Sequence, residues 1–241
     1  MNIEFKVRDF CLRGKLHLPK NKRPALVIGS HGLEGSMNSA KQMVLSRLLP
    51  ENGIAFFRFD HRGCGSSDGD FIKETSLEKR TEDYLAAVQH LIDLDLFSGD
   101  IGLFGSSMGG ATCINAWNLL EQMEVNLRGG VLCSAPVRSR TIENIPVQAN
   151  DSRPALPLTF FAENLLFDIL DKAQDLHHVL VFHGDRDEVV PVSNALELHD
   201  RMRSPKKLII HKNGDHQMTD KGDQDEFERE TLSWFLSICK A

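Results

Sequence analysis

The sequence lacks any long uninterrupted apolar stretch. Although 41% of the 241 residues are hydrophobic, no run approaches the roughly 18 apolar residues that a membrane-spanning helix needs. The first residues, Met1 to Asp9, alternate apolar and charged side chains and contain no apolar core of a signal peptide. These absences predict a cytoplasmic protein without a transmembrane segment.

Clustered basic charge is also missing. The 28 Lys and Arg residues are scattered among 34 Asp and Glu residues, so the net charge is −6 and no basic stripe or tail exists. Nucleic acid carries dense negative charge and is bound by concentrated basic surface, so we expect no nucleic-acid partner. The sequence alone does not determine an oligomeric state.

Cysteine and histidine occur without the spacing of a disulfide framework or a metal site. The 10 histidines include no His-Glu-x-x-His or similar ligand pattern, so we expect no metal and no cofactor. The cysteines are odd in number and far apart, and most are expected to be small core residues. One of them, Cys64, lies in a Gly-rich loop and is either buried and inert or exposed and oxidisable. The five are Cys11, Cys64, Cys113, Cys133 and Cys239.

What the sequence does contain is a regular alternation of strand-like and helix-like segments. This order predicts an α/β fold with a doubly wound, mostly parallel sheet, in one domain over residues 1–241. Two β-like segments, Asn2 to Val7 and Phe10 to Leu18, come first and predict an antiparallel edge hairpin. The further expected strands are 25–30, 54–59, 100–104, 129–134, 178–183 and 206–211, and the expected helices are 38–51, 77–95, 108–123, 162–175, 192–203 and 222–239.

One proline-rich segment interrupts the alternation. Residues 136–161 carry Pro136, Pro146, Pro154 and Pro157 and show little periodicity. A loop that leaves the carboxyl edge of a parallel strand lies where ligands bind in such sheets. The segment is therefore expected to form a short cover above the sheet, and the alternative is a long surface loop without a role.

The run Gly105-Ser106-Ser107-Met108-Gly109 lies between a short apolar strand and a helix. A Gly-x-Ser-x-Gly in this context is typical of a nucleophile elbow, where the central serine adopts a cramped backbone conformation and its hydroxyl projects above the sheet. The glycines leave room for that turn. Ser107 is the predicted nucleophile, and an ordinary strand-to-helix turn is the alternative.

A candidate acid and a candidate base follow in the chain order Ser, Asp, His, which a catalytic triad requires on this type of sheet. Asp185, Asp187 and Glu188 all follow the strand 178–183, and Asp187 is the favoured acid. After the last strand, His216 lies beyond a Gly-containing turn that can bring its imidazole back over the sheet, whereas His211 ends the strand itself. His216 is therefore the predicted base.

These pieces together resemble the α/β-hydrolase family over nearly the whole chain, and within it small bacterial carboxylesterases of the cinnamoyl or feruloyl esterase type. Two further segments match, namely His31 to Ser36 and Asp60 to Gly69. The resemblance implies that the first is an oxyanion loop, in which the backbone N–H of Leu33 acts with that of Met108. It implies an architectural role for the second, in which the Arg62 guanidinium can bond several carbonyls.

The resemblance and the three residues imply a serine ester hydrolase that works through an acyl-enzyme. Ser107 attacks the ester, His216 accepts its proton and Asp187 holds the imidazole tautomer. The alternatives are an acyltransferase with the same triad and a non-catalytic binding protein of this fold. The apolar end of the cover favours small-molecule esters with short acyl or aryl groups, unless Phe160 and Phe161 simply pack the cover onto the body.

Overall fold

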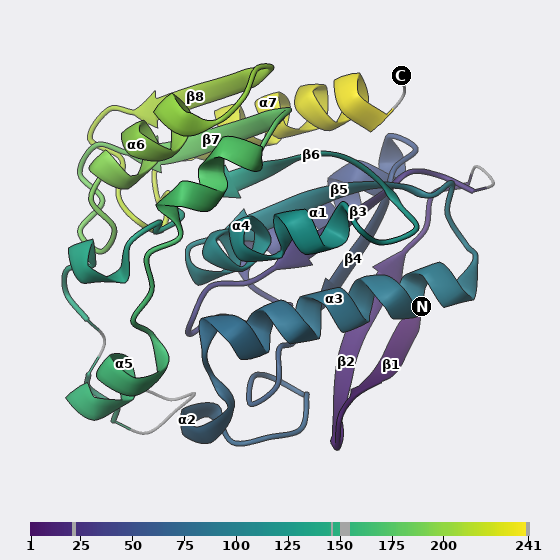
Figure 1. The fold of residues 1–241 in the computed structure, drawn as a ribbon. Helices are drawn as coiled ribbons and strands as arrows, with labels where there is room; N and C mark the ends of the chain where they lie inside the picture. Colours follow the sequence, from purple (N-terminus) through teal and green to yellow (C-terminus); the bar gives the residue numbers. More distant parts are fainter. Residues whose placement is uncertain (21–22, 146, 150–154, 240–241) are drawn as a thin grey trace.

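A single sheet of eight strands runs through the computed structural model, which describes residues 1–20, 23–145, 147–149 and 155–239. The strand order is β1-β2-β4-β3-β5-β6-β7-β8, with the β1–β2 hairpin at one edge and β8 at the other (Figure 1). All pairings from β4 to β8 are parallel, and β2 pairs antiparallel with both β1 and β4. The predicted mostly parallel sheet with an antiparallel N-terminal hairpin is confirmed. The bounds are β1 (Asn2–Val7), β2 (Phe10–His17), β3 (Leu26–Ser30), β4 (Ala55–Phe59), β5 (Asp100–Ser106), β6 (Asn126–Cys133), β7 (Val179–Gly184) and β8 (Lys206–His211).

Helices cover both faces of the sheet. On one face lie α1 (Ala40–Glu51) and α7 (Lys221–Cys239), and on the other lie α3 (Leu77–Leu94), α4 (Met108–Leu120) and α6 (Ser193–Arg201). Because helices cover the central strands on both sides, β3, β4 and β7 are buried at every position, as in parallel sheets generally. The edge strand β1 is covered on one face only, so its residues alternate between exposed and buried.

The prediction of one helix over 162–175 is wrong. The chain forms instead a short helix, α5 (Leu158–Asn164), and a 3₁₀ segment, η2 (Leu170–Asp175). Between them the backbone pairs with the chain after β6, where the N–H of Ile169 donates to the carbonyl of Val137 over 2.9 Å. This long-range pairing replaces the helical hydrogen bonds that the local pattern favours.

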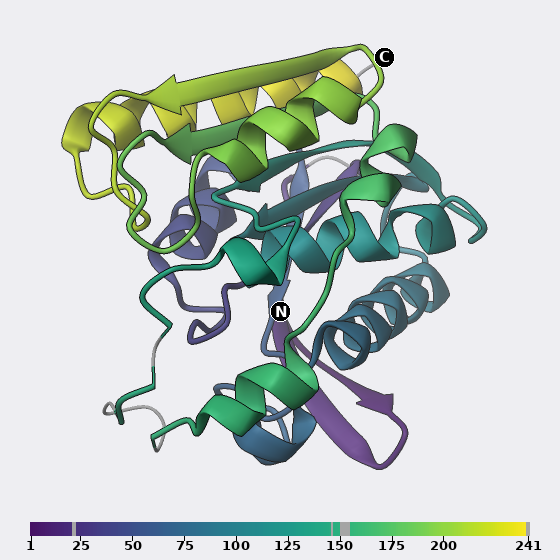
Figure 2. The same ribbon diagram turned by 60° about the vertical axis from the view of Figure 1, so that its left-hand side comes forward.

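Much of the predicted cover, 136–161, is described by the structure, although residues 146 and 150–154 lie outside the described part. α5 stands apart from the sheet beside a short helix that the sequence did not predict, α2 (Phe71–Glu74) (Figure 2). The two are joined by Phe160 and Phe71, whose ring centroids are 5.8 Å apart. Phe160 is 2% exposed, so it packs this segment onto the body.

The interpretation of Cys64 as an inert residue agrees with its position. Its side chain is 6% exposed, and burial raises the pKa of the thiol. A buried thiol with a raised pKa carries little thiolate, which is the reactive form. All five cysteines are free.

Acid should destabilise the fold through His17. Its neutral Nε2 accepts a hydrogen bond from Arg58 Nε over 3.1 Å, and burial, followed by the Arg58 charge, lowers the pKa of His17 to about 4. An unfolded histidine titrates near 6.5, so between about pH 6.5 and pH 4 only the unfolded state binds this proton. The stabilising effect of neutral His17 is therefore present above that window and is lost as the pH falls through it.

The slope of the free energy of unfolding against pH measures how many more protons the unfolded state binds than the folded state. We accordingly expect His17→Gln to reduce this difference by up to about one proton between pH 4 and pH 6.5. Urea unfolding at a series of pH values measures the slope in both proteins. An identical slope would contradict the assignment. His31 and His61 remain in the variant, and because burial holds their pKa values well below the ordinary range, part of the slope should persist.

Candidate active site

Ser107 occupies a strained turn between β5 and α4. Its backbone angles are φ 53° and ψ −124°, a conformation that costs a non-glycine residue about 1–3 kcal/mol and that clusters at functional sites. The flanking glycines allow it. A Cβ on Gly105 would lie 2.5 Å from the carbonyl oxygen of Gly109, and one on Gly109 would lie 2.0 Å from that of Ser30.

The structure brings the three predicted triad residues into one hydrogen-bonded line. His216 Nε2 lies 3.1 Å from Ser107 Oγ, and its Nδ1 lies 2.8 and 2.9 Å from the two carboxylate oxygens of Asp187. The carboxylate can only accept, so His216 carries its proton on Nδ1, and Nε2 is left to accept from the serine hydroxyl. The residues come from three loops at the carboxyl edge of the sheet, after β5, β7 and β8.

The other three candidate residues, Asp185, Glu188 and His211, have different contacts. Asp185 accepts a hydrogen bond from the N–H of Asn213 over 2.6 Å, and Glu188 accepts one from the backbone N–H of His216 over 3.1 Å. His211 is buried at the end of β8 and lies 3.4 Å from Glu226 of α7. The structure therefore joins Asp187, and neither of the other two loop acids, to the His216 ring.

Asp187 is held by more donors than the sequence indicates. Its Oδ1 accepts from the N–H groups of Val189 and Val190 over 2.9 and 2.8 Å, and His183 Nε2 lies 3.3 Å from Oδ2. Burial acts to raise the pKa of Asp187, but hydrogen bonds from His183 and then His216 outweigh it and hold this pKa well below its ordinary value. Asp187 is therefore an anion throughout the physiological pH range.

His183 is a residue of the site that sequence reasoning missed. It is the penultimate residue of β7 and its side chain is fully buried, with Nε2 bonded to the carbonyl of Val190 over 2.7 Å. The available signal was a histidine inside an otherwise apolar buried strand, four positions before the favoured acid.

The two N–H groups expected to hold an oxyanion flank the same serine. Met108 begins α4 directly after Ser107, and the first N–H groups of a helix have no partner within it. A Cβ on Gly32, which precedes Leu33, would lie 3.5 Å from Ser107 Cβ. Among the described residues, neither the N–H of Leu33 nor that of Met108 has a hydrogen-bond partner.

Ser107 and His216 line a cavity of about 730 Å³, which is within the usual range for a small-molecule site. Part of its wall comes from the predicted cover. Phe161 lines the cavity while the neighbouring Phe160 packs inward, so the two phenylalanines differ in role. The apolar side chains that the segment 142–165 contributes are Ile142, Ile145, Leu158, Phe161, Ala162 and Leu165.

Within the described ranges there is no group of three or more His, Cys, Asp or Glu side chains arranged to hold a metal ion. No helix in that part of the chain is long and apolar enough to cross a membrane.

The fold and the site define a serine hydrolase of the α/β-hydrolase class. A family model described as serine aminopeptidase S33 (Hydrolase_4) matches residues 21–165, and the chain belongs to that family. The mitochondrial palmitoyl-protein thioesterase ABHD10 of Rattus norvegicus is 30% identical over 222 residues, which cover 85% of this chain and 72% of that protein. The uncharacterized protein YfhR of Escherichia coli strain K12 is 27% identical over 224 residues, which cover 89% of this chain and 72% of that one.

A solved structure shows the same fold. Est1E from Butyrivibrio proteoclasticus, with ferulic acid bound, superimposes with a TM-score of 0.84 at 23% identity, covering 99% of this chain and 100% of that one. The predicted α/β-hydrolase fold and the resemblance to that family are thereby confirmed.

Proposed function

We propose that this protein hydrolyses carboxylic esters through an acyl-enzyme on Ser107. The observation that carries the proposal is the continuous line of hydrogen bonds from Ser107 Oγ through the His216 ring to Asp187, at the wall of an apolar cavity. A serine hydroxyl is a weak nucleophile on its own and needs a base within hydrogen-bond reach, which is the geometry present here. A palmitoyl-protein thioesterase among the relatives supports the hydrolysis of an acyl bond.

The reaction follows from what each group can do. His216 Nε2 takes the proton of Ser107 as Oγ attacks the ester carbonyl, and the resulting oxyanion is held by the N–H groups of Leu33 and Met108. His216 then gives its proton to the leaving alcohol, and the acyl-enzyme remains. Water repeats the sequence: His216 removes its proton, its oxygen attacks the acyl carbon, and Ser107 leaves reprotonated. Asp187, an anion, stabilises the imidazolium at both stages.

A fluorophosphonate probe tests the proposed function, because it forms a covalent bond only with an activated serine. Labelling mapped to Ser107 by peptide mass spectrometry, together with turnover of a soluble ester, is the expected result. No labelling would favour a non-catalytic binding protein. Preferential formation of a new ester when an alcohol is added would favour an acyltransferase.

The substrate class is expected to be esters with short acyl or aryl groups. Phe161 and neighbouring apolar side chains of 136–161 bound the cavity, and a flat aromatic or short chain can bury its surface against them. We therefore expect acetyl to butyryl or hydroxycinnamoyl esters to give a higher kcat/KM than esters of about twelve carbons or more.

A panel of esters of increasing chain length, assayed below the concentration at which they form micelles, measures this preference. Each acyl group should also be offered as a thioester, because loss of the thiol from its tetrahedral intermediate yields the same acyl-enzyme as the ester does, and ABHD10 is a thioesterase. Preference for long chains would contradict the short-acyl expectation while leaving the roles of Ser107 and His216 intact.

A further inference from the structure

A buried arginine lies behind the loop that carries Leu33. Arg80, on α3, is 1% exposed, and its Nη2 donates hydrogen bonds to the backbone carbonyls of His31 and, over 3.4 Å, of Gly32. Its Nε and Nη1 meet no oxygen or nitrogen acceptor among the described residues, and the Cys64 thiol beside them is a weak acceptor. Among the described residues, Arg80 therefore donates its hydrogen bonds to oxygen only to the loop carbonyls of residues 31 and 32.

If its role were only structural, burying the Arg80 charge would cost free energy of folding without a clear gain. A buried charge loses its hydration, and an apolar side chain of similar size often stabilises a core equally well. The nearby carboxylate of Asp83 does not bond to Arg80. It is already engaged with Arg62, whose Nε donates over 2.6 Å, and with His61, whose Nδ1 lies 3.3 Å away.

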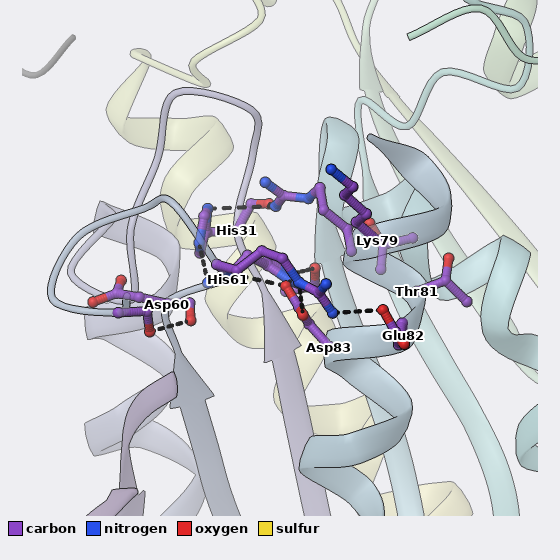
Figure 3. A network of polar contacts seen from close by, with 12 residues as sticks. His31, Asp60, His61, Lys79, Thr81, Glu82 and Asp83 are labelled. Atoms are coloured by element: carbon purple, nitrogen blue, oxygen red, sulfur yellow. Dashed lines mark hydrogen bonds and ion pairs between the residues drawn. The ribbon is translucent and has the colours of Figure 1, made fainter. Parts of the chain in front are cut away.

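The His31 ring also donates a hydrogen bond to the carbonyl of Gly32. The N–H of His61 donates to His31 Nε2 over 3.2 Å, so the ring proton of His31 is on Nδ1 and is donated to the carbonyl of Gly32 over 2.7 Å. Figure 3 shows His31 and His61 next to each other, with Asp83 of α3 close to His61. Two donors thus point the Gly32 carbonyl toward α3.

The orientation of that carbonyl determines the orientation of the next N–H. In a trans peptide the C=O and N–H groups point in opposite directions, so the N–H of Leu33 points away from α3. Gly32 lies next to Ser107, because a Cβ placed on Gly32 would be 3.5 Å from the Cβ of Ser107. We propose that Arg80 is a positioning residue for the oxyanion site: by binding the carbonyls of His31 and Gly32, it fixes the Leu33 N–H toward the reacting carbonyl at Ser107.

The proposal rests on the proposed ester hydrolysis, and it makes a specific kinetic prediction. A donor that acts on the oxyanion stabilises the transition state and not the bound substrate. Arg80→Met should lower kcat by about 10²–10³-fold, as loss of an oxyanion donor does, while KM changes by no more than about threefold. Binding of a trifluoromethyl ketone, which forms a tetrahedral oxyanion adduct with Ser107, should weaken in proportion to kcat/KM.

Arg62→Met is the matched control, because Arg62 is equally buried and belongs to the same network but bonds to carboxylates of α3 and not to the loop. It should lower the melting temperature while kcat and the affinity for the ketone stay within about threefold of the wild type. Arg80→Lys, which keeps the cation and a single donor group, provides a second test should the methionine variant fail to fold. Its loss of kcat should be smaller and should again be matched by the loss of ketone affinity.

Two outcomes would overturn the role of Arg80. One is kcat within about threefold of the wild type in the folded Arg80 variants, and the other is a loss of kcat without any loss of ketone affinity. Wild-type protein that neither reacts with a fluorophosphonate nor hydrolyses esters would instead overturn the proposed function itself. The two failures are therefore distinguishable.

Discussion

Replacing Ser107 by alanine is expected to lower kcat for ester hydrolysis by up to about 10⁶-fold, because the covalent step loses its nucleophile. The variant should remain folded, because the Ser107 hydroxyl bonds to His216 and not to the backbone of the turn, whose shape depends on Gly105 and Gly109. Steady-state turnover of a soluble ester and circular dichroism measure the two effects separately. Fluorophosphonate labelling should disappear in the same variant.

Ser106→Ala is the matched control for that experiment. Ser106 is the last residue of β5 and stands next to the nucleophile, but no hydrogen bond links it to His216 among the described contacts. Its variant should keep kcat within about tenfold of the wild type. Equal losses in the Ser106 and Ser107 variants would mean that the elbow is wrongly assigned.

Asp187→Asn is expected to lower kcat by about 10⁴-fold, because an amide facing His216 Nδ1 favours the wrong tautomer and does not stabilise the imidazolium. The backbone of the loop should persist, since the asparagine oxygen can still accept from the N–H groups of Val189 and Val190. kcat measured over a range of ester concentrations tests the expectation, with the melting temperature as a check on folding.

Asp185→Asn separates the acids of this loop. The Asp185 carboxylate accepts a hydrogen bond from the N–H of Asn213 and has no contact with the His216 ring. The variant should therefore lose stability more than activity. A larger loss of kcat in the Asp185 variant would move the acid by two residues and leave Ser107 and His216 in place.

The sequence by itself predicted the sheet, its edge hairpin and the chain order of the three candidate catalytic residues. Those features are local. A short apolar run in the sequence indicates a strand. The elbow at Ser107 is indicated by two glycines, whose lack of side chains allows the close contacts that the structure contains. His216 was separated from His211 by its place after the turn, which is also a local property.

Only the tertiary structure decided which loop acid faces the His216 ring, because Asp185, Asp187 and Glu188 are nearly equivalent in the sequence and differ in where the loop folds. The same applies to the helix wrongly expected over 162–175, where pairing of Ile169 with Val137 replaced the local helical pattern. It applies also to Arg80, whose contacts join α3 to a loop far away in the chain. Contacts between distant segments depend on how the layers pack, and neither hydrophobic period nor turn chemistry encodes them.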